Sequence, residues 1–328
     1  MSEAVRGEGG YLLNNKGERF MANYAPSKME LAPRDVVAKA IETEIAEGRG
    51  FGKGLDAYVV ADVRHLPKEV ILEKLHGIRE LAITFEHADP LTQPIPIRPT
   101  CHYSMGGIDV VDYKTCGTVV PGLFAAGEAS CVSIHGANRL GGNSLADAVV
   151  FGKVAGEGAV AYVAEHSQAD AKQALDDAAK YWENRFTEVT SRKDGRPIAE
   201  IRDEMANAMW NKVGIFREAG KMQEALDTLN KLIEEYKTCF VGDTNRTFNM
   251  AFVNYVEVGS LLTVAKAAVM GAMRRKESRG SHLREDFPKR DDKNFLNHTL
   301  ITLNANGEYE VGQRDVVVTR FEPKERTY

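Results

Sequence analysis

The sequence predicts a multi-domain protein of the α+β / α/β class, and three observations support this. The chain has 328 residues, enough for two or more hydrophobic cores. Short strand patterns alternate with helical patterns over residues 1–165, and residues 169–275 are helical throughout. The charged tail from Glu277 ends in short strand patterns. We therefore expect α/β parts, a helical bundle and a small β-containing end.

The first elements are a hairpin and a helix. YLLNNKGERFMANY, residues 11–24, is typical of strand, turn and strand. A helix is then predicted between Asp35, which can cap its start, and Gly48, which can end it. Its apolar residues recur at helical spacing: Val37, Ile41 and Ile45.

A strand and a second helix follow before a boundary. AYVVADVRHL alternates as a strand does, and a helix is predicted over residues 69–82. The Pro-rich stretch DPLTQPIPIRPT marks a boundary near residues 89–100.

Beyond the boundary the pattern is that of one strand–loop–helix unit. HYSMGGIDV and GLFAAGEAS indicate short strands, the second ending at Gly127 and Glu128. A long apolar helix is predicted over residues 143–165, with Ser144 and Asp147 at capping-box spacing.

The region after residue 165 predicts antiparallel helices. Helical patterns cover 169–189, a segment starting after Pro197, 220–237 and 250–274. Four apolar residues of the second helix share one face: Ile198, Ile201, Met205 and Met209. LITLNANGEYEV and DVVVTRFE predict strands at the end of the chain.

Composition excludes several classes of protein. The net charge of −5 argues against a nucleic-acid surface. We find no run of about 18 apolar residues and no secretory leader, so direct membrane insertion is not expected. None of the four cysteines forms a C-x-x-C pair, so we expect reduced thiols and no metal or iron–sulfur site built from this chain.

The stretch HGANRLGGNSLADAVVFG predicts a cofactor or anion site. Its glycines permit close backbone approach, and Arg139 offers a planar fork suited to a carboxylate. Asn143 and Ser144 open a helix whose first N–H groups favour an anion. Glu128, at the end of the preceding strand, can accept from a ribose hydroxyl. Taken singly, each feature also fits an ordinary turn.

Three further positions have both a functional and a structural interpretation. His102 follows the Pro-rich boundary and can face a cleft, although a lone histidine is usually structural. Arg34 stands at a helix start, which its charge disfavours, and it can also be a surface ion-pair residue. SEAVRGEGG, residues 2–10, places an acid, Glu3, beside a base, Arg6, and is either a solvated tail or the edge of a site.

These motifs occur together in one known family. SEAVRGEGG, ELAPRD, RPTCHYSMGGI, GLFAAGEAS, HGANRLGGNSLADAVVFG and RKESRGSHLREDFPKRDDKNFLNHTL resemble the flavoprotein subunit of succinate dehydrogenase and fumarate reductase. The resemblance covers essentially the whole chain. L-aspartate oxidase shares most of these motifs, while RDDKNFLNHTL and the strand-rich tail are more similar to the dehydrogenase/reductase branch.

The resemblance implies a fold and a domain order. It implies a partial FAD-dependent fumarate reductase-type flavoprotein with a partial capping domain (1–90), the returning segment of the FAD domain (91–165), a helical bundle (166–286) and a small C-terminal domain (287–328). The G-x-G-x-x-G turn and the FAD-linking histidine of the family lie upstream of the segment matching SEAVRGEGG. The chain is therefore expected to be a C-terminal portion, by truncation, a split gene or a mis-called start.

The resemblance also implies residue roles. Arg34 resembles the residue that exchanges a proton with substrate carbon, and Glu3 and Arg6 resemble its relay to solvent. Three residues resemble those that bind the dicarboxylate: His102, Arg139 and Ser2. Four positions resemble or adjoin those that bind FAD: Glu128, Asn143, Ser144 and Leu145.

The implied function is flavin-dependent interconversion of succinate and fumarate, with hydride passing to or from FAD N5. Electrons would pass to an iron–sulfur subunit and a quinone, with membrane association through an anchor subunit on the cytoplasmic face. An aspartate oxidase, or an inactive remnant that binds partners, remains an alternative. The sequence leaves open the physiological direction, the quinone type and whether FAD is covalently linked.

Overall fold

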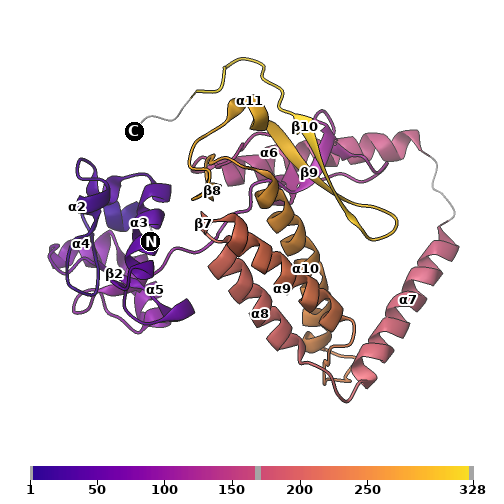
Figure 1. The fold of residues 1–328 in the computed structure, drawn as a ribbon, viewed down its shortest axis with the longest axis horizontal. Helices are drawn as coiled ribbons and strands as arrows, with labels where there is room; N and C mark the ends of the chain where they lie inside the picture. Colours follow the sequence, from indigo (N-terminus) through magenta and orange to yellow (C-terminus); the bar gives the residue numbers. More distant parts are fainter. Residues whose placement is uncertain (1–2, 167–170, 325–328) are drawn as a thin grey trace. The chain divides into compact units, whose positions relative to one another are not determined.

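The computed structural model describes residues 3–166 and 171–324, and it places them in two compact units that divide between His102 and Tyr103 (Figure 1). For Glu3 only the backbone is described.

The first unit contains a three-stranded antiparallel sheet. Its strands are β1 (Tyr11–Leu13), β2 (Val59–Asp62) and β3 (Ile95–Ile97), with β2 in the middle. The strand predicted in AYVVADVRHL is confirmed. The predicted hairpin is wrong, because β1 pairs with the distant β2 and the chain after β1 enters helix α2 (Met21–Tyr24).

Helix α3 (Arg34–Ala46) packs on this sheet and confirms the predicted helix. Val37 and Ile41 are buried and form one core with strand residues such as Val59. Gly48, with φ of +77°, donates to the Ile45 carbonyl while the next amide donates to the Glu44 carbonyl, which is the Schellman ending. The predicted Asp35 cap is wrong, since Pro33 occupies the cap position and Asp35 lies in the first turn.

The rest of the first unit consists of short elements. The single helix predicted over 69–82 is instead two helices, α4 (Lys68–Glu73) and α5 (His76–Glu86). The other elements are α1 (Glu3–Gly7) and the 3-10 turns η1 (Met29–Leu31) and η2 (Gly54–Asp56).

The second unit begins with a small mixed sheet under one long helix. Strand β4 (Ile108–Asp112) pairs antiparallel with β5 (Gly117–Thr118) and parallel with β6 (Ser130–Cys131). The predicted helix over 143–165 is confirmed as α6 (Asn143–Glu165), which packs Phe151 and Val154 on this sheet's core. In GLFAAGEAS an isolated bridge forms at Phe124, the 3-10 turn η3 (Gly127–Ala129) replaces the expected strand end, and Ser130 begins β6.

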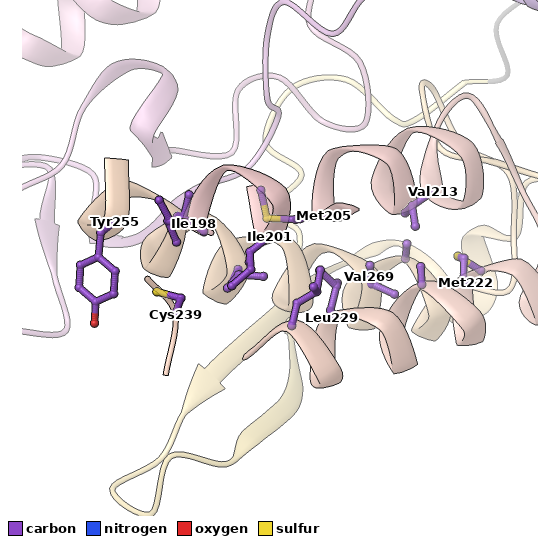
Figure 2. Packing of buried hydrophobic residues seen from close by; sticks show 14 of the residues in the cluster. Ile198, Ile201, Met205, Val213, Met222, Leu229, Cys239, Tyr255 and Val269 are labelled. Carbon is purple, nitrogen blue, oxygen red and sulfur yellow. The ribbon is translucent and has the colours of Figure 1, made fainter. Parts of the chain in front are cut away.

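The predicted bundle is formed mainly by α8 (Ile198–Val213), α9 (Ala219–Tyr236) and α10 (Met250–Arg274), which pack against one another (Figure 1). Ile201, Leu229 and Val269 lie in their shared core, as Figure 2 shows. Helix α7 (Lys172–Ser191) adds Val189 to this core, while most of its length is exposed.

Helix α10 is long and apolar enough to cross a membrane by length and composition, and it is the one such helix in the described parts of the chain. Sequence analysis had not expected any such segment. The buried side chains of α10, among them Tyr255 and Leu262, belong to the bundle core.

The C-terminal segment of the chain contributes a short strand, a short helix and a hairpin to the second unit. Strand β8 (Leu283–Arg284) pairs with β7 (Phe216–Arg217), and a short helix α11 (Asp292–Phe295) precedes a hairpin. The hairpin is β9 (Asn297–Leu303) with β10 (Tyr309–Asp315), so the first predicted strand pattern is confirmed. DVVVTRFE contributes only its first residue to β10.

Candidate active site

Arg6 is buried, and its guanidinium braces the segment that leads into α3. Its Nη1 donates to the carbonyl oxygens of Glu30, at 3.0 Å, and Ala32, at 2.8 Å. Both carbonyls precede Arg34, the first residue of α3. Arg6 therefore fixes the approach to the helix end that carries Arg34.

The Glu30 carboxylate holds the same segment from its other side. It accepts from the Leu12 amide at 3.1 Å and from both Nε and Nη2 of Arg19. Burial acts to raise the pKa of Glu30, but the hydrogen bonds from Arg19 and Leu12 outweigh it and hold this pKa below its usual value. An ionised carboxylate thus ties β1 to the turn before Arg34.

The predicted catalytic residues of the first unit are only partly described. Arg34 and His102 are exposed, and His102 is the last residue of the unit. Ser2 lies outside the described residues, and of Glu3 only its place at the start of α1 is known. The proton relay through Glu3 therefore stays a prediction.

Arg139 lies in the second unit, on the loop before α6. Its Nη1 donates to the Leu140 carbonyl at 2.9 Å, and its guanidinium carbon lies 4.5 Å from the centre of the Tyr103 ring. Arg139 and His102 belong to different units, so the expectation that both bind the same substrate carboxylate also stays a prediction.

The N-terminus of α6 fits an anionic group. The cap residue is Gly142, with φ of +82°, and it has no side-chain hydrogen bond to the helix. The predicted Ser144–Asp147 capping box is therefore wrong. Because no side chain caps this end, the amides of Ser144 and Leu145 are suited to a phosphate, while the Asn143 amide donates to Leu140.

Glu128 lies on η3 rather than at a strand end. Its side chain is exposed, and Oε1 accepts from the Ser104 amide at 2.8 Å. This bond ties η3 to the Gly-rich turn after His102 and holds a carboxylate at the surface, where it can accept from a hydroxyl group of a ligand.

Sequence reasoning missed a partly buried polar cluster beside Arg139. Tyr103, His135 and Asp147 contact one another through their polar atoms. Asp147 had been interpreted only as a helix-capping residue. The neighbouring pair Tyr103 and His102, and the histidine that opens HGANR, are the signals that could have indicated it.

A second missed contact supports the Arg139 loop from the C-terminal segment. The amide and the hydroxyl of Ser281 both donate to the Ala137 carbonyl, each at 2.9 Å. Gly280 has φ of +58°, and a Cβ there would lie 2.4 Å from the same oxygen. Only glycine permits this close approach.

All four cysteines lie among the described residues, and none of them is in a disulfide there. In the described parts of the chain, no group of three histidine, cysteine, aspartate or glutamate side chains is placed to hold a metal ion.

The sequence matches known proteins from end to end. Residues 1–145 match the family model described as "FAD binding domain", and residues 202–328 match "Fumarate reductase flavoprotein C-term". The chain thus belongs to the FAD-dependent flavoproteins. Within this class it is a member of the fumarate reductase/succinate dehydrogenase flavoprotein family.

Individual relatives agree with this assignment. The chain is 52% identical to the 8-methylmenaquinol:fumarate reductase flavoprotein subunit of Wolinella succinogenes, over 100% of this chain and 53% of the relative. It is 41% identical to the succinate dehydrogenase flavoprotein subunit of Coxiella burnetii, over 99% of this chain and 57% of the relative. The chain thus spans about half the length of the curated relatives it matches.

Solved structures show the same fold. A structure of E. coli quinol fumarate reductase FrdA superposes with a TM-score of 0.90 at 40% identity, covering 99% of this chain and 57% of that chain. Adenylylsulfate reductase from Archaeoglobus fulgidus, at 16% identity and a TM-score of 0.68, covers 96% of this chain and 56% of that chain and shares the fold alone.

Proposed function

We propose that this chain forms part of a flavoprotein subunit that interconverts succinate and fumarate. The observation that carries the proposal is the Arg139 loop. It holds a half-buried guanidinium directly before the uncapped start of α6, within the segment matched to FAD-binding domains. A carboxylate-binding cation thus adjoins a site suited to the phosphates of a dinucleotide.

FAD is the cofactor of this class, and the residues present fit it. Asn143, Ser144 and Leu145 form the first turn of α6 and would hold an anionic part of FAD, and Glu128 would accept from a hydroxyl group. When bound, the flavin supplies hydride transfer at N5.

The substrate would be a small dicarboxylate. His102 and Arg139 would bind one carboxylate, and Ser2 would bind the other. Cationic partners on the carboxylates fix the geometry and draw electron density from the double bond of fumarate. This lowers the barrier to hydride addition at one carbon.

Arg34 would exchange the proton at the neighbouring carbon. A guanidinium is a weak acid with a pKa above about 12, so it needs a carbanion-like acceptor and a means of reprotonation. Glu3 and Arg6 would provide that relay. The two carbonyl contacts of Arg6 keep its guanidinium beside the segment leading to Arg34.

Partners and location follow from this function. Electrons would leave through an iron–sulfur subunit to a quinone, and anchor subunits would hold the complex at the membrane, on the cytoplasmic face. The domains would be the capping domain (1–90), a segment of the FAD domain (91–165), the helical bundle (166–286) and the C-terminal domain (287–328).

The experiment uses a chimeric flavoprotein in which the unmatched part of the Wolinella succinogenes subunit is joined to this chain. Its flavin absorbance is recorded with and without fumarate, and its fumarate and succinate turnover is measured. We expect bound flavin, a spectral change with fumarate, and turnover.

Three results would contradict the proposal or its details. Oxidation of L-aspartate in place of succinate would favour an aspartate oxidase, and absence of bound flavin would favour an inactive remnant. In Arg139→Ala we expect weaker fumarate binding as well as slower turnover, so unchanged affinity would remove Arg139 from the substrate clamp.

A further inference from the structure

Tyr103, Asp147 and His135 form a compact polar cluster next to Arg139. The Tyr103 hydroxyl lies 2.9 Å from Nε2 of His135 and 3.3 Å from Oδ2 of Asp147. The same two atoms of His135 and Asp147 are 3.1 Å apart. The Asp147 side chain is 1% exposed and that of His135 10%, and Tyr103 is half-buried, so the contacts are largely shielded from solvent.

The chemistry of the groups assigns their protons. A carboxylate oxygen accepts, so the phenol of Tyr103 and a protonated Nε2 of His135 both donate to Oδ2 of Asp147, and the Nε2 proton also faces the Tyr103 oxygen. Burial, followed by the charge of Asp147, raises the pKa of Tyr103, which keeps the phenol protonated and able to donate.

This cluster fixes the ring on which Arg139 lies. The guanidinium carbon of Arg139 is 4.5 Å from the Tyr103 ring centre, within the range of a cation–π contact. Asp147 is on the rigid helix α6, while Tyr103 and His135 are on loops. The hydrogen bonds therefore anchor the Tyr103 ring to helix α6, and this ring lies beside Arg139, the proposed substrate-binding residue.

We propose that Tyr103, held by His135 and Asp147, is a positioning residue that orients the guanidinium of Arg139 toward the dicarboxylate. The inference rests on the proposed function for the identity of the substrate. The arrangement of the side chains does not depend on it.

The kinetic test uses Tyr103→Phe in the chimeric flavoprotein. This variant keeps the ring under Arg139 and removes only the hydrogen bonds. Loss of one such bond predicts a rise of about three- to tenfold in the KM for fumarate. Tyr113→Phe is the matched control, because it removes another phenol of the same unit, one that accepts from Arg314. The KM of the control should stay unchanged.

A double-mutant cycle separates positioning from general structural support. In an Arg139→Ala background, Tyr103→Phe should raise the KM no further, because its effect passes through Arg139. An unchanged KM in Tyr103→Phe, or additive effects of the two substitutions, would overturn the proposal.

The second measurement needs no turnover and is made on this chain. The Nε–Hε resonance of Arg139 in nuclear magnetic resonance spectra should carry a ring-current shift from Tyr103. Asp147→Asn, which weakens the hold on the ring, should reduce that shift, and Tyr113→Phe should not.

The two measurements distinguish failure of the proposed function from failure of the positioning proposal. A shift that responds to Asp147→Asn in this chain, together with a chimera that shows no fumarate turnover, would refute the proposed function and support the positioning cluster. A shift that does not respond would refute the cluster whatever the activity.

Discussion

Replacing Glu44 by glutamine should destabilise the first unit by far more than the loss of an exposed carboxylate would. Glu44 lies on α3, the helix that begins with Arg34, and its side chain is 1% exposed. Its carboxylate accepts from Asn14, from the Tyr24 hydroxyl and from two nitrogens of Arg49. Burial acts to raise the pKa of Glu44, but the hydrogen bonds from Arg49, Asn14 and Tyr24 outweigh it and lower this pKa to about 2.

The size and pH dependence of the effect follow from this shift. A fall from 4.5 to about 2 corresponds to about 3 kcal/mol of stabilisation of the folded state. Since the folded pKa is depressed, the stabilisation is complete above pH 4.5 and is lost as pH falls toward 2. The deficit of Glu44→Gln should thus be about 2–3 kcal/mol at pH 7 and shrink with acidification.

Hydrogen exchange of the α3 amides measures this stability, because both tryptophans lie in the second unit and do not report on the first. The matched control is Glu47→Gln, which removes a carboxylate that also pairs with Arg49 but is 54% exposed. Such a surface pair contributes about 1 kcal/mol or less. Equal losses in the two variants, or a Glu44→Gln deficit as large at pH 2.5 as at pH 7, would refute the reasoning.

Three other predictions concern this chain and the chimeric flavoprotein. In the chimeric flavoprotein, Arg34→Lys should abolish fumarate turnover while flavin and fumarate binding persist, because lysine lacks the planar fork; wild-type-like rates would remove Arg34 from the mechanism. Gly280→Ala should destabilise the chain in thermal unfolding by about 1–3 kcal/mol more than Gly307→Ala, which shares a positive φ but has no neighbour within 4 Å; equal losses would contradict the close-contact argument. The exposed apolar side chains of α6 predict that this chain binds 8-anilinonaphthalene-sulfonate more strongly than the chimera, and equal fluorescence would contradict it.

The elements that the sequence predicts well are those set by local periodicity. Val37 and Ile41 recur on one face, and Gly48 permits the left-handed ending, so α3 needs no distant partner to be predicted. The hairpin failed because strand pairing is not local. The side chain of Asn14 accepts from the amides of Lys16 and Glu18 and turns the chain toward α2, while β1 finds its partner in β2.

In the candidate site, too, the sequence predicts the features that are local in the chain and misses the contacts between distant residues. Arg139 and the start of α6 are adjacent in sequence, so a Gly-rich loop before an apolar helix was enough to indicate them. Asp147 was misassigned because Ser-x-x-Asp imitates a capping box, whose last residue, at the N3 position, is normally the longer Glu or Gln. Its true partners are Tyr103 and His135, and no local pattern encodes their approach.

The support of Arg139 extends beyond the FAD-binding segment. The loop that carries this residue lies within residues 1–145, yet the Ala137 carbonyl receives two hydrogen bonds from Ser281, within the segment matched to the C-terminal model. Gly280 permits this contact by leaving no Cβ in the way. The C-terminal segment braces one side of the loop, and the cluster of Tyr103, His135 and Asp147 is proposed to orient Arg139 through the Tyr103 ring, so the guanidinium would be preorganised from two sides. Preorganisation of this kind lowers the cost of orienting a substrate carboxylate, so a change at Gly280 should act on fumarate affinity through Arg139.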